Sequence, residues 1–394
     1  MRKTIALVLV LLFVLLPNAA YAAEKAPVEE HCRAYILVES KTGAVLAESC
    51  ADDVMPMASL TKMMTLLILF EQIASGDVKL TDTVTVSQNA ADTTGSKAFI
   101  DAGASYTVDQ LIRSIIVGSA NDSCVAIAEF LSGSEEAFVL KMNERAQALG
   151  MTSTTFCNAT GLPHDNHVST ARDMAALSCA LVHHDMYFDY STIWIDNFAH
   201  PSGRETMLAN TNKLIRYGTG VDGIKTGFTN AAGFCLSASS ERDGMRLIAV
   251  VLGGSTSKGR FEQASQLLEW GFANYEYKEE LLPPEEFSLR VNITGGREDY
   301  VDVVPEEKFM LLMQKGSDGE LIHRVELPQS VAAPIAQNQT LGVWIVEHEG
   351  QVVAEIPLST TAAVERATFS DCLERILKLW YTGSKTAEDA KDIA

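Results

Sequence analysis

The chain has 394 residues, of which 47% are hydrophobic and 21% charged, so it can bury a packed core and is not a disordered protein. Its 31 lysines and arginines stand against 51 aspartates and glutamates, and a net charge of −20 argues against binding to nucleic-acid phosphates. The seven cysteines contain no CxxC pair and the eight histidines no HExxH spacing, so neither a metal site nor a cofactor is expected.

The N-terminus has the layout of a secretory signal peptide. Arg2 and Lys3 precede the apolar run 5–16, and the small-residue site Ala20-Tyr21-Ala22 follows. Twelve apolar residues are too few to span a bilayer, which takes about 20. We therefore expect residues 1–22 to be removed and the mature protein to work outside the cytoplasm, with an uncleaved N-terminal anchor as the alternative.

The first part of the mature chain mixes strand and helix patterns. Apolar runs around Lys41-Thr42-Gly43 predict a hairpin over 34–46, and a dense apolar pattern predicts a buried helix over 59–72. Thr107 and Asp109 are typical of a helix start. Further helices are predicted at 107–131, 134–149, 170–183 and 260–274, and strands at 233–240 and 245–254.

Beyond 277–284 the pattern changes to short alternating runs separated by glycine and proline, which predicts an all-β module of about 80 residues. The predicted strands are 287–293, 300–304, 309–313, 321–327, 343–346 and 352–356. The tail at 368–383 predicts a helix with one apolar face, formed by Phe369, Leu373, Ile376, Leu377 and Trp380. This face fits a membrane interface or packing on protein equally well.

Three short motifs carry the chemistry, and each also occurs at a second place. S-x-x-K occurs at Ser59-Leu60-Thr61-Lys62 and at Ser255–Lys258, S-x-N at Ser87–Asn89 and at Ser119–Asn121, and K-T-G at 41–43 and at 225–227. Together, motifs of these three kinds are typical of penicillin-binding proteins and β-lactamases.

Context selects one set. Ser59 opens the apolar helix, and the i, i+3 spacing puts Lys62 on the same helix face, where burial lowers a lysine pKa and makes the amine a usable base. Ser255 lies in a polar turn and Ser87 in a strand pattern, whereas Ser119 ends a helical pattern where a loop can face a cleft. The ordered set is therefore Ser59/Lys62, Ser119/Asn121 and 225–227.

Around these motifs the sequence resembles the low-molecular-mass penicillin-binding proteins that are serine D-alanyl-D-alanine carboxypeptidases of the peptidase S11 family. The resemblance runs from about Ala34 through the C-terminal helix. The stretches that carry it are PMASLTKMMT (56–65), TVDQLIRSIIVGSANDS (107–123), LGMTSTTFCNATGLP (149–163), STARDMA (169–175), TNKL (211–214), VDGIKTGFTNAAGF (221–234) and GGSTSKGRF (253–261).

The resemblance implies a role for each motif residue. Ser59 is the acylated nucleophile, Lys62 takes its proton, and Ser119 and Asn121 relay or orient from the other wall. The backbone N–H of Ser59 supplies one half of the oxyanion hole.

The third motif and its neighbours are assigned to substrate binding. Lys225, Thr226 and Gly227 hold the substrate from an edge strand, and the N–H of Phe228 completes the oxyanion hole. Some relatives have histidine where this chain has Phe228, so only the backbone role carries over. Arg260, with Thr226, fixes the terminal carboxylate, which a guanidinium can bind bidentately.

The implied architecture is α+β: a penicillin-binding, β-lactamase-like transpeptidase domain, with an antiparallel sheet flanked by helices and a helical subdomain, then a small β-sandwich and a C-terminal amphipathic helix. We expect a signal peptide at 1–22, the catalytic domain at 27–277, the β-sandwich at 284–360, a membrane-associating helix at 366–383 and a disordered tail at 384–394.

The implied partners are peptidoglycan stem peptides ending in D-Ala-D-Ala, β-lactams as inhibitors and, through the tail helix, the outer face of the bacterial cytoplasmic membrane.

Two other functions stay open from the sequence. A class A β-lactamase needs a glutamate for deacylation, but the pattern ExxLN is missing and 205–210 is one residue off. A non-catalytic penicillin-binding wall protein would not need an intact Ser59, Lys62 and Lys225. His164, Asp165 and His167 lie in a loop that can flank the cleft and receive no role.

Overall fold

The computed structural model describes residues 25–217, 220–281, 288–305, 309–317, 321–348 and 350–377. These residues form two compact units, which divide between Tyr275 and Glu276. The predicted signal peptide and the end of the tail, with Trp380 and 384–394, lie outside the described residues. Within the described ranges, no helix combines the length and the apolar character that crossing a bilayer requires.

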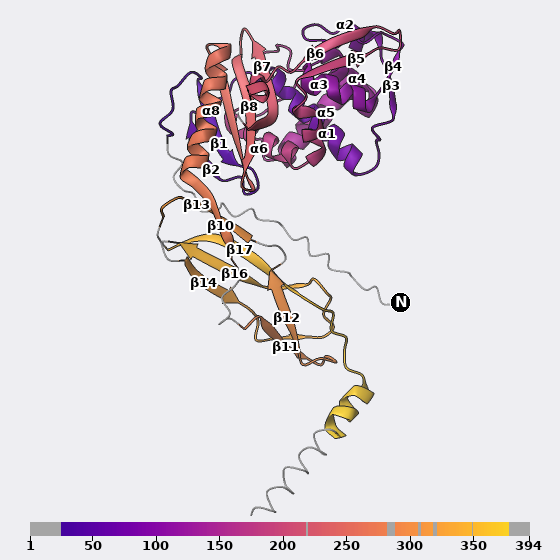
Figure 1. The fold of residues 1–394 in the computed structure, drawn as a ribbon. Helices are drawn as coiled ribbons and strands as arrows, with labels where there is room; N and C mark the ends of the chain where they lie inside the picture. The colour runs from indigo at the N-terminus through magenta and orange to yellow at the C-terminus, as the bar shows by residue number, and fades with distance from the viewer. Residues whose placement is uncertain are drawn as a thin grey trace, which may run out of the picture. The chain divides into compact units, whose positions relative to one another are not determined.

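The first unit is built on a five-stranded antiparallel sheet with the strand order β2-β1-β9-β8-β7 (Figure 1). The predicted hairpin at 34–46 and the two predicted strands near 233–254 are confirmed. The strands are β1 (Ala34–Glu39), β2 (Val45–Ser49), β7 (Val221–Thr229), β8 (Gly233–Arg242) and β9 (Met245–Gly254). Strand β7, which carries the selected K-T-G, is at the edge of the sheet.

Helices cover both faces of this sheet. On one face α8 (Ser257–Asn274) packs so closely that a Cβ on Gly271 would lie 2.5 Å from Leu247 and 2.8 Å from Leu37. On the other face α6 (Ala171–Val182) brings the Ser178 hydroxyl within 2.8 Å of the Ser237 hydroxyl. Burial from both sides explains why β9 is continuously apolar instead of alternating.

The helical part of the unit departs from the prediction at one place. The pattern at 107–131 is two helices, α3 (Val108–Val117) and α4 (Asn121–Ser132), because Ser119 takes a left-handed φ of 56° that interrupts the helix. Thr107 caps α3 as predicted, in a capping box with Gln110. The other elements are η1 (Ala58–Thr61), α1 (Lys62–Ala74), β3 (Thr83–Thr85), α2 (Gln88–Asp92), β4 (Ser105–Thr107), α5 (Glu135–Ala148), η2 (Asp185–Tyr187), α7 (Phe188–Ser191), β5 (Ile195–Ala199), β6 (Glu205–Ala209) and η3 (Lys213–Tyr217).

Up to residue 366 the second unit is built from β-strands, as the alternating runs predict. Its six-stranded sheet has the order β14-β16-β17-β12-β11-β15, and β10 and β13 form a separate pair. The strands are β10 (Tyr275–Leu281), β11 (Arg290–Thr294), β12 (Tyr300–Pro305), β13 (Phe309–Gln314), β14 (Leu321–Glu326), β15 (Ser330–Ala332), β16 (Thr340–His348) and β17 (Gln351–Thr360). Strands β10 and β15 are not among the strands predicted from the sequence.

A helix at 369–377 follows the β unit, begun by Thr368, whose hydroxyl accepts from the Asp371 N–H. Isolated bridges at Val364 and Arg366 pin the chain to the β unit just before this helix. Arg297 then pairs with Asp371 at 3.2 Å. The apolar side chains of the predicted face that the structure describes are exposed, to 83% at Phe369, 46% at Leu373, 62% at Ile376 and 54% at Leu377.

Candidate active site

The structure brings Ser59 and Lys62 into direct contact at the start of the buried helix. Ser59 lies within η1 and Lys62 begins α1, and Lys62 Nζ is 2.9 Å from Ser59 Oγ. Lys62 is fully buried, whereas Ser59 is partly exposed and can be reached from solvent. Lys62 Nζ also donates to the Thr160 carbonyl at 2.5 Å, which fixes the amine in place.

Burial sets the charge state of this amine. Desolvation is the largest cause of a shift that lowers the pKa of Lys62 to about 8, against the smaller opposing effects of Cys124 and Asp122. A neutral amine has one lone pair, so Lys62 can donate to Thr160 and accept the Ser59 proton together. The pair is therefore chemically suited to activate a serine hydroxyl.

The second motif lies at the start of α4, with Ser119 just before the helix and Asn121 as its first residue. Ser119 and Asn121 are both about 95% buried, and the turn that holds them is fixed by the loop at 94–100. Asn121 Nδ2 donates to the Thr94 carbonyl at 2.6 Å, and its backbone N–H donates to Ser96 at 2.7 Å. The buried Asp122 carboxylate accepts the N–H groups of residues 98 and 100, at 3.0 and 3.2 Å.

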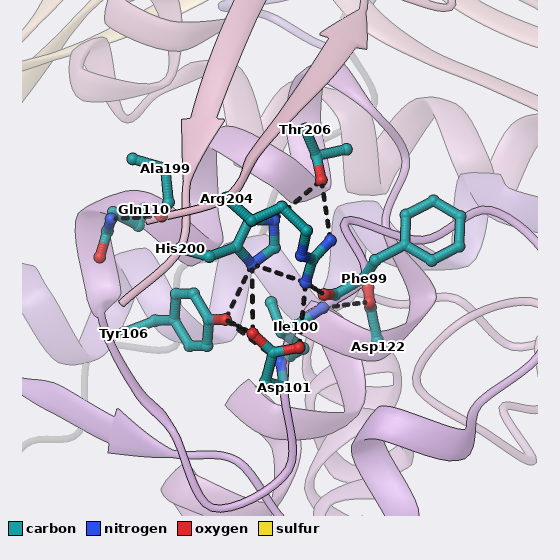
Figure 2. Close-up of polar contacts among 10 residues, drawn as sticks. All are labelled: Phe99, Ile100, Asp101, Tyr106, Gln110, Asp122, Ala199, His200, Arg204 and Thr206. Atoms are coloured by element: carbon teal, nitrogen blue, oxygen red, sulfur yellow. Dashed lines mark hydrogen bonds and ion pairs between the residues drawn. The ribbon is translucent and has the colours of Figure 1, made fainter. Parts of the chain in front are cut away.

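The hairpin of β5 and β6 fastens this loop from its other side (Figure 2). Arg204 Nη2 donates to the Phe99 carbonyl at 2.6 Å and pairs with Asp101 at 3.0 Å. His200 contacts the Tyr106 hydroxyl through Nδ1 at 2.9 Å and the Thr206 hydroxyl through Nε2 at 2.8 Å. The loop beside Asn121 is thus held between α4 and the hairpin.

The third motif lies on β7 and passes close to Ser59. A Cβ on Gly227 would lie 3.1 Å from the Ser59 nitrogen and 3.0 Å from the Met57 carbonyl, so only glycine lets the strand approach η1 this closely. Lys225 is 98% buried, and burial together with the charge of Lys62 lowers its pKa well below that of an ordinary lysine. Thr226 donates through its hydroxyl to Thr211 at 2.7 Å.

The two remaining predicted residues lie beside β7. Phe228 is 51% exposed, and its ring stacks on Phe234 at a centroid distance of 4.4 Å. Arg260 is 93% buried and donates through Nη1 to the Gly227 carbonyl at 2.8 Å and the Cys235 carbonyl at 3.1 Å. The observed contacts of Arg260 therefore hold the end of β7, and carboxylate binding by it stays a prediction.

The three rejected motif copies lie in ordinary structural positions. Ser87 caps α2, and Thr42 closes the β1–β2 turn onto Glu39. Lys258 is exposed and pairs with Glu262. The near match to ExxLN is on β6, where Glu205 is exposed.

Sequence reasoning missed the groups that support Lys62 and Ser59. The Thr160 carbonyl is a backbone atom with no sequence signal. His167 has no sequence pattern that assigns it a role, yet it is 97% buried and its Nε2 is 2.7 Å from the Thr61 hydroxyl, next to both catalytic candidates. Burial, with smaller contributions from His164 and Lys62, lowers the pKa of His167 to about 4, so the ring is neutral near pH 7.

Comparison with known proteins identifies related families along most of the chain. The family model described as D-alanyl-D-alanine carboxypeptidase matches residues 20–256, and that of the penicillin-binding protein 5 C-terminal domain matches residues 284–366. The chain is 35% identical to the D-alanyl-D-alanine carboxypeptidase DacF of Bacillus subtilis, over 88% of this chain and 89% of that protein. It is also 35% identical to DacC of Escherichia coli, over 91% of this chain and 90% of that one.

Two solved structures of penicillin-binding proteins resemble this chain in fold. Penicillin-binding protein 5 from Haemophilus influenzae superposes with a TM-score of 0.74 at 32% identity, over 86% of this chain and 99% of that one. Penicillin-binding protein D2 from Listeria monocytogenes, solved in an ampicillin-bound form, superposes with a TM-score of 0.53 at 31% identity, over 61% and 98%. The chain therefore belongs to the D-alanyl-D-alanine carboxypeptidase family, peptidase S11, as its motifs predict.

Proposed function

We propose that this chain is a serine D,D-carboxypeptidase that removes the terminal D-alanine from peptidoglycan pentapeptide stems and is acylated and inhibited by β-lactams. The observation that carries the proposal is the 2.9 Å contact between Ser59 Oγ and a fully buried Lys62 Nζ. Family membership supplies the substrate class, since the relatives are named for this activity.

In the first half-reaction the neutral Lys62 amine takes the Ser59 proton as Oγ bonds to the carbonyl carbon of the penultimate D-alanine. The negative charge that develops on the carbonyl oxygen is stabilised by the N–H groups of Ser59 and Phe228. The C–N bond then breaks, and Lys62 passes the proton that it took from Ser59 through Ser119 to the leaving amine of the terminal D-alanine, which makes the lysine neutral again. Water hydrolyses the ester on Ser59 in the second half-reaction, which regenerates the hydroxyl.

Substrate binding is assigned to the other predicted residues. The β7 segment Lys225-Thr226-Gly227 holds the peptide along the edge of the sheet, and Asn121 orients it from the opposite wall. Arg260 and Thr226 bind the free terminal carboxylate. Arg260 is suited to this because burial beside β7 desolvates its guanidinium, lowering its pKa to about 10, and a desolvated cation attracts a carboxylate strongly.

The test is release of free D-alanine from diacetyl-L-Lys-D-Ala-D-Ala by the mature protein, with intact-mass detection of the penicillin adduct. The proposal predicts both D-alanine release and a stable adduct on Ser59. Rapid turnover of benzylpenicillin without D-alanine release would make the chain a β-lactamase. The absence of both products would make it a non-catalytic wall protein.

We further propose that the protein is exported and works at the outer face of the cytoplasmic membrane. The N-terminal pattern supports export, and the exposed apolar side chains of the 369–377 helix support binding to a lipid surface. Such a helix lies in the interface and does not cross the membrane.

A further inference from the structure

The peptide bond between Ala58 and Ser59 is held in an unusual frame. Ala58 has a φ of 50°, in the left-handed region that L-residues with a side chain rarely adopt. Its carbonyl faces Gly161, where an added Cβ would lie only 2.0 Å from the Ala58 oxygen. The Ser59 nitrogen is close to two glycines, because an added Cβ would lie 2.9 Å from it on Gly161 and 3.1 Å from it on Gly227. In a trans peptide the C=O and N–H point in opposite directions, so whatever holds the Ala58 carbonyl also aims the Ser59 N–H.

A chain of three hydrogen bonds ends on that carbonyl. The Cys157 N–H donates to His167 Nδ1 at 2.9 Å, which leaves the proton of the neutral ring on Nε2. His167 Nε2–H then donates to Thr61 Oγ1 at 2.7 Å. The Thr61 hydroxyl is therefore free to donate its own proton to the Ala58 carbonyl, also at 2.7 Å. The Cys157 N–H can only donate, and this determines which atom donates and which accepts in each of the following hydrogen bonds.

We propose that His167 and Thr61 are positioning residues that orient the Ala58–Ser59 peptide and so aim the Ser59 N–H at the oxyanion of the acylation step. This inference rests on the proposed function, because it assigns a cause to one half of the proposed oxyanion hole. Neither residue touches the substrate. Their effect is on the transition state, in which negative charge develops on the carbonyl oxygen, and hardly on the ground state.

The test compares Thr61→Val, which removes the hydroxyl and keeps the shape, with Thr65→Val as the matched control. Thr65 is equally buried one turn later in α1, and its hydroxyl donates at 2.8 Å to the Ala159 carbonyl, away from the Ala58–Ser59 peptide. Removing one oxyanion donor costs about 10²–10³ in rate, so a misaimed donor in Thr61→Val should slow acylation by benzylpenicillin about 10- to 100-fold. Thr65→Val should acylate near the parent rate, and Thr61→Ser, which keeps a hydroxyl, should do the same.

A boronic acid analogue of the D-alanyl peptide reports the oxyanion hole directly. Its boron accepts an electron pair from Ser59 Oγ, whose proton passes to Lys62, and a boron-bound oxygen then occupies the oxyanion position. Thr61→Val should lose affinity for this analogue by the same factor as it loses acylation rate, with little change in the KM of the peptide. His167→Phe should match Thr61→Val, and the double variant should be no slower than the slower single variant, because both interrupt one chain.

The inference is overturned if Thr61→Val and Thr65→Val acylate at equal rates, or if the boronate affinity of Thr61→Val stays at the parent value. Additive losses in the double variant also overturn it, since they indicate two independent packing defects. Failure of the proposed function is a separate result, because the parent protein itself would then release no D-alanine from the peptide.

Discussion

The buried Lys62 amine should make acylation depend on pH in a defined way. Burial lowers the pKa of Lys62 from 10.5 to about 8, so at pH 7 about one molecule in ten has the neutral amine, against about one in three thousand for an ordinary lysine. Desolvation of Lys62 therefore raises the fraction of molecules with a neutral amine at pH 7 about 300-fold. Lys62→Arg keeps the positive charge but cannot lose its proton, and so removes the base.

The assay is the second-order rate constant for acylation by benzylpenicillin between about pH 6 and 10. We expect the rate to rise about tenfold per pH unit and to level off above about pH 8, and Lys62→Arg to lose the 10²–10⁴ that a positioned base contributes. A rate that is flat from pH 6 to 8, or an arginine variant within tenfold of the parent, would refute the assignment of Lys62 as the base.

Stability gives a second readout that does not depend on catalysis. The unfolded chain binds the Lys62 proton with a pKa near 10.5 and the folded chain with a pKa of about 8, so the cost of burying this amine, about 3 kcal/mol, is complete below pH 8 and disappears as pH rises to 10.5. The free energy of unfolding of Lys62→Met, relative to the parent, should therefore be higher at pH 7 than at pH 10.5 by up to about that amount. A difference that does not vary with pH would show that the lysine pKa is unperturbed.

Three further outcomes are expected. Ser59→Ala should fold normally and give no β-lactam adduct by intact mass, and an adduct on another serine would contradict the site. Arg260→Lys should lose about 10- to 100-fold in kcat/KM for the peptide with a free terminal carboxylate, because the planar bidentate donor is lost. The same variant should hydrolyse an ester substrate that lacks this carboxylate at the parent rate. Equal losses on both substrates would mean that Arg260 only supports β7. A chain ending at Ala367 keeps the bridges at Val364 and Arg366 and should stay active but no longer sediment with anionic vesicles, whereas unchanged sedimentation would exclude the helix as the membrane contact.

Part of the site's geometry follows from the sequence, and part does not. An apolar helix start and a polar turn differ in composition, so context favours Ser59 over Ser255, and the structure places Ser59 in contact with Lys62. Context was not enough to break the helix at Ser119, since a serine in a left-handed conformation has no composition signal and depends on tertiary contacts. The all-β unit was visible from alternation, but β10 and β15 were missed; β15 has only three residues, too few for a period to show.

His167 and the Thr160 carbonyl could not be predicted from the sequence for a different reason. His167 is separated from Thr61 by 106 residues, and its role depends on which ring nitrogen a backbone N–H contacts. Lys62 is fixed by a carbonyl, which every residue has. Such contacts follow from the path of the main chain, which no local pattern of side chains specifies.

The junction before the helix at 369–377 fixes how this helix is attached to the β unit. A bridge at Arg366 and a hydrogen bond from the Ala367 N–H fasten the chain to the β unit, and only Thr368 separates this point from the helix at 369–377. Arg375 adds a second fastening, an ion pair with Asp299 at 3.0 Å. The connection is therefore rigid and is not a flexible linker. A membrane surface that binds the helix would also fix the orientation of the β unit relative to that surface.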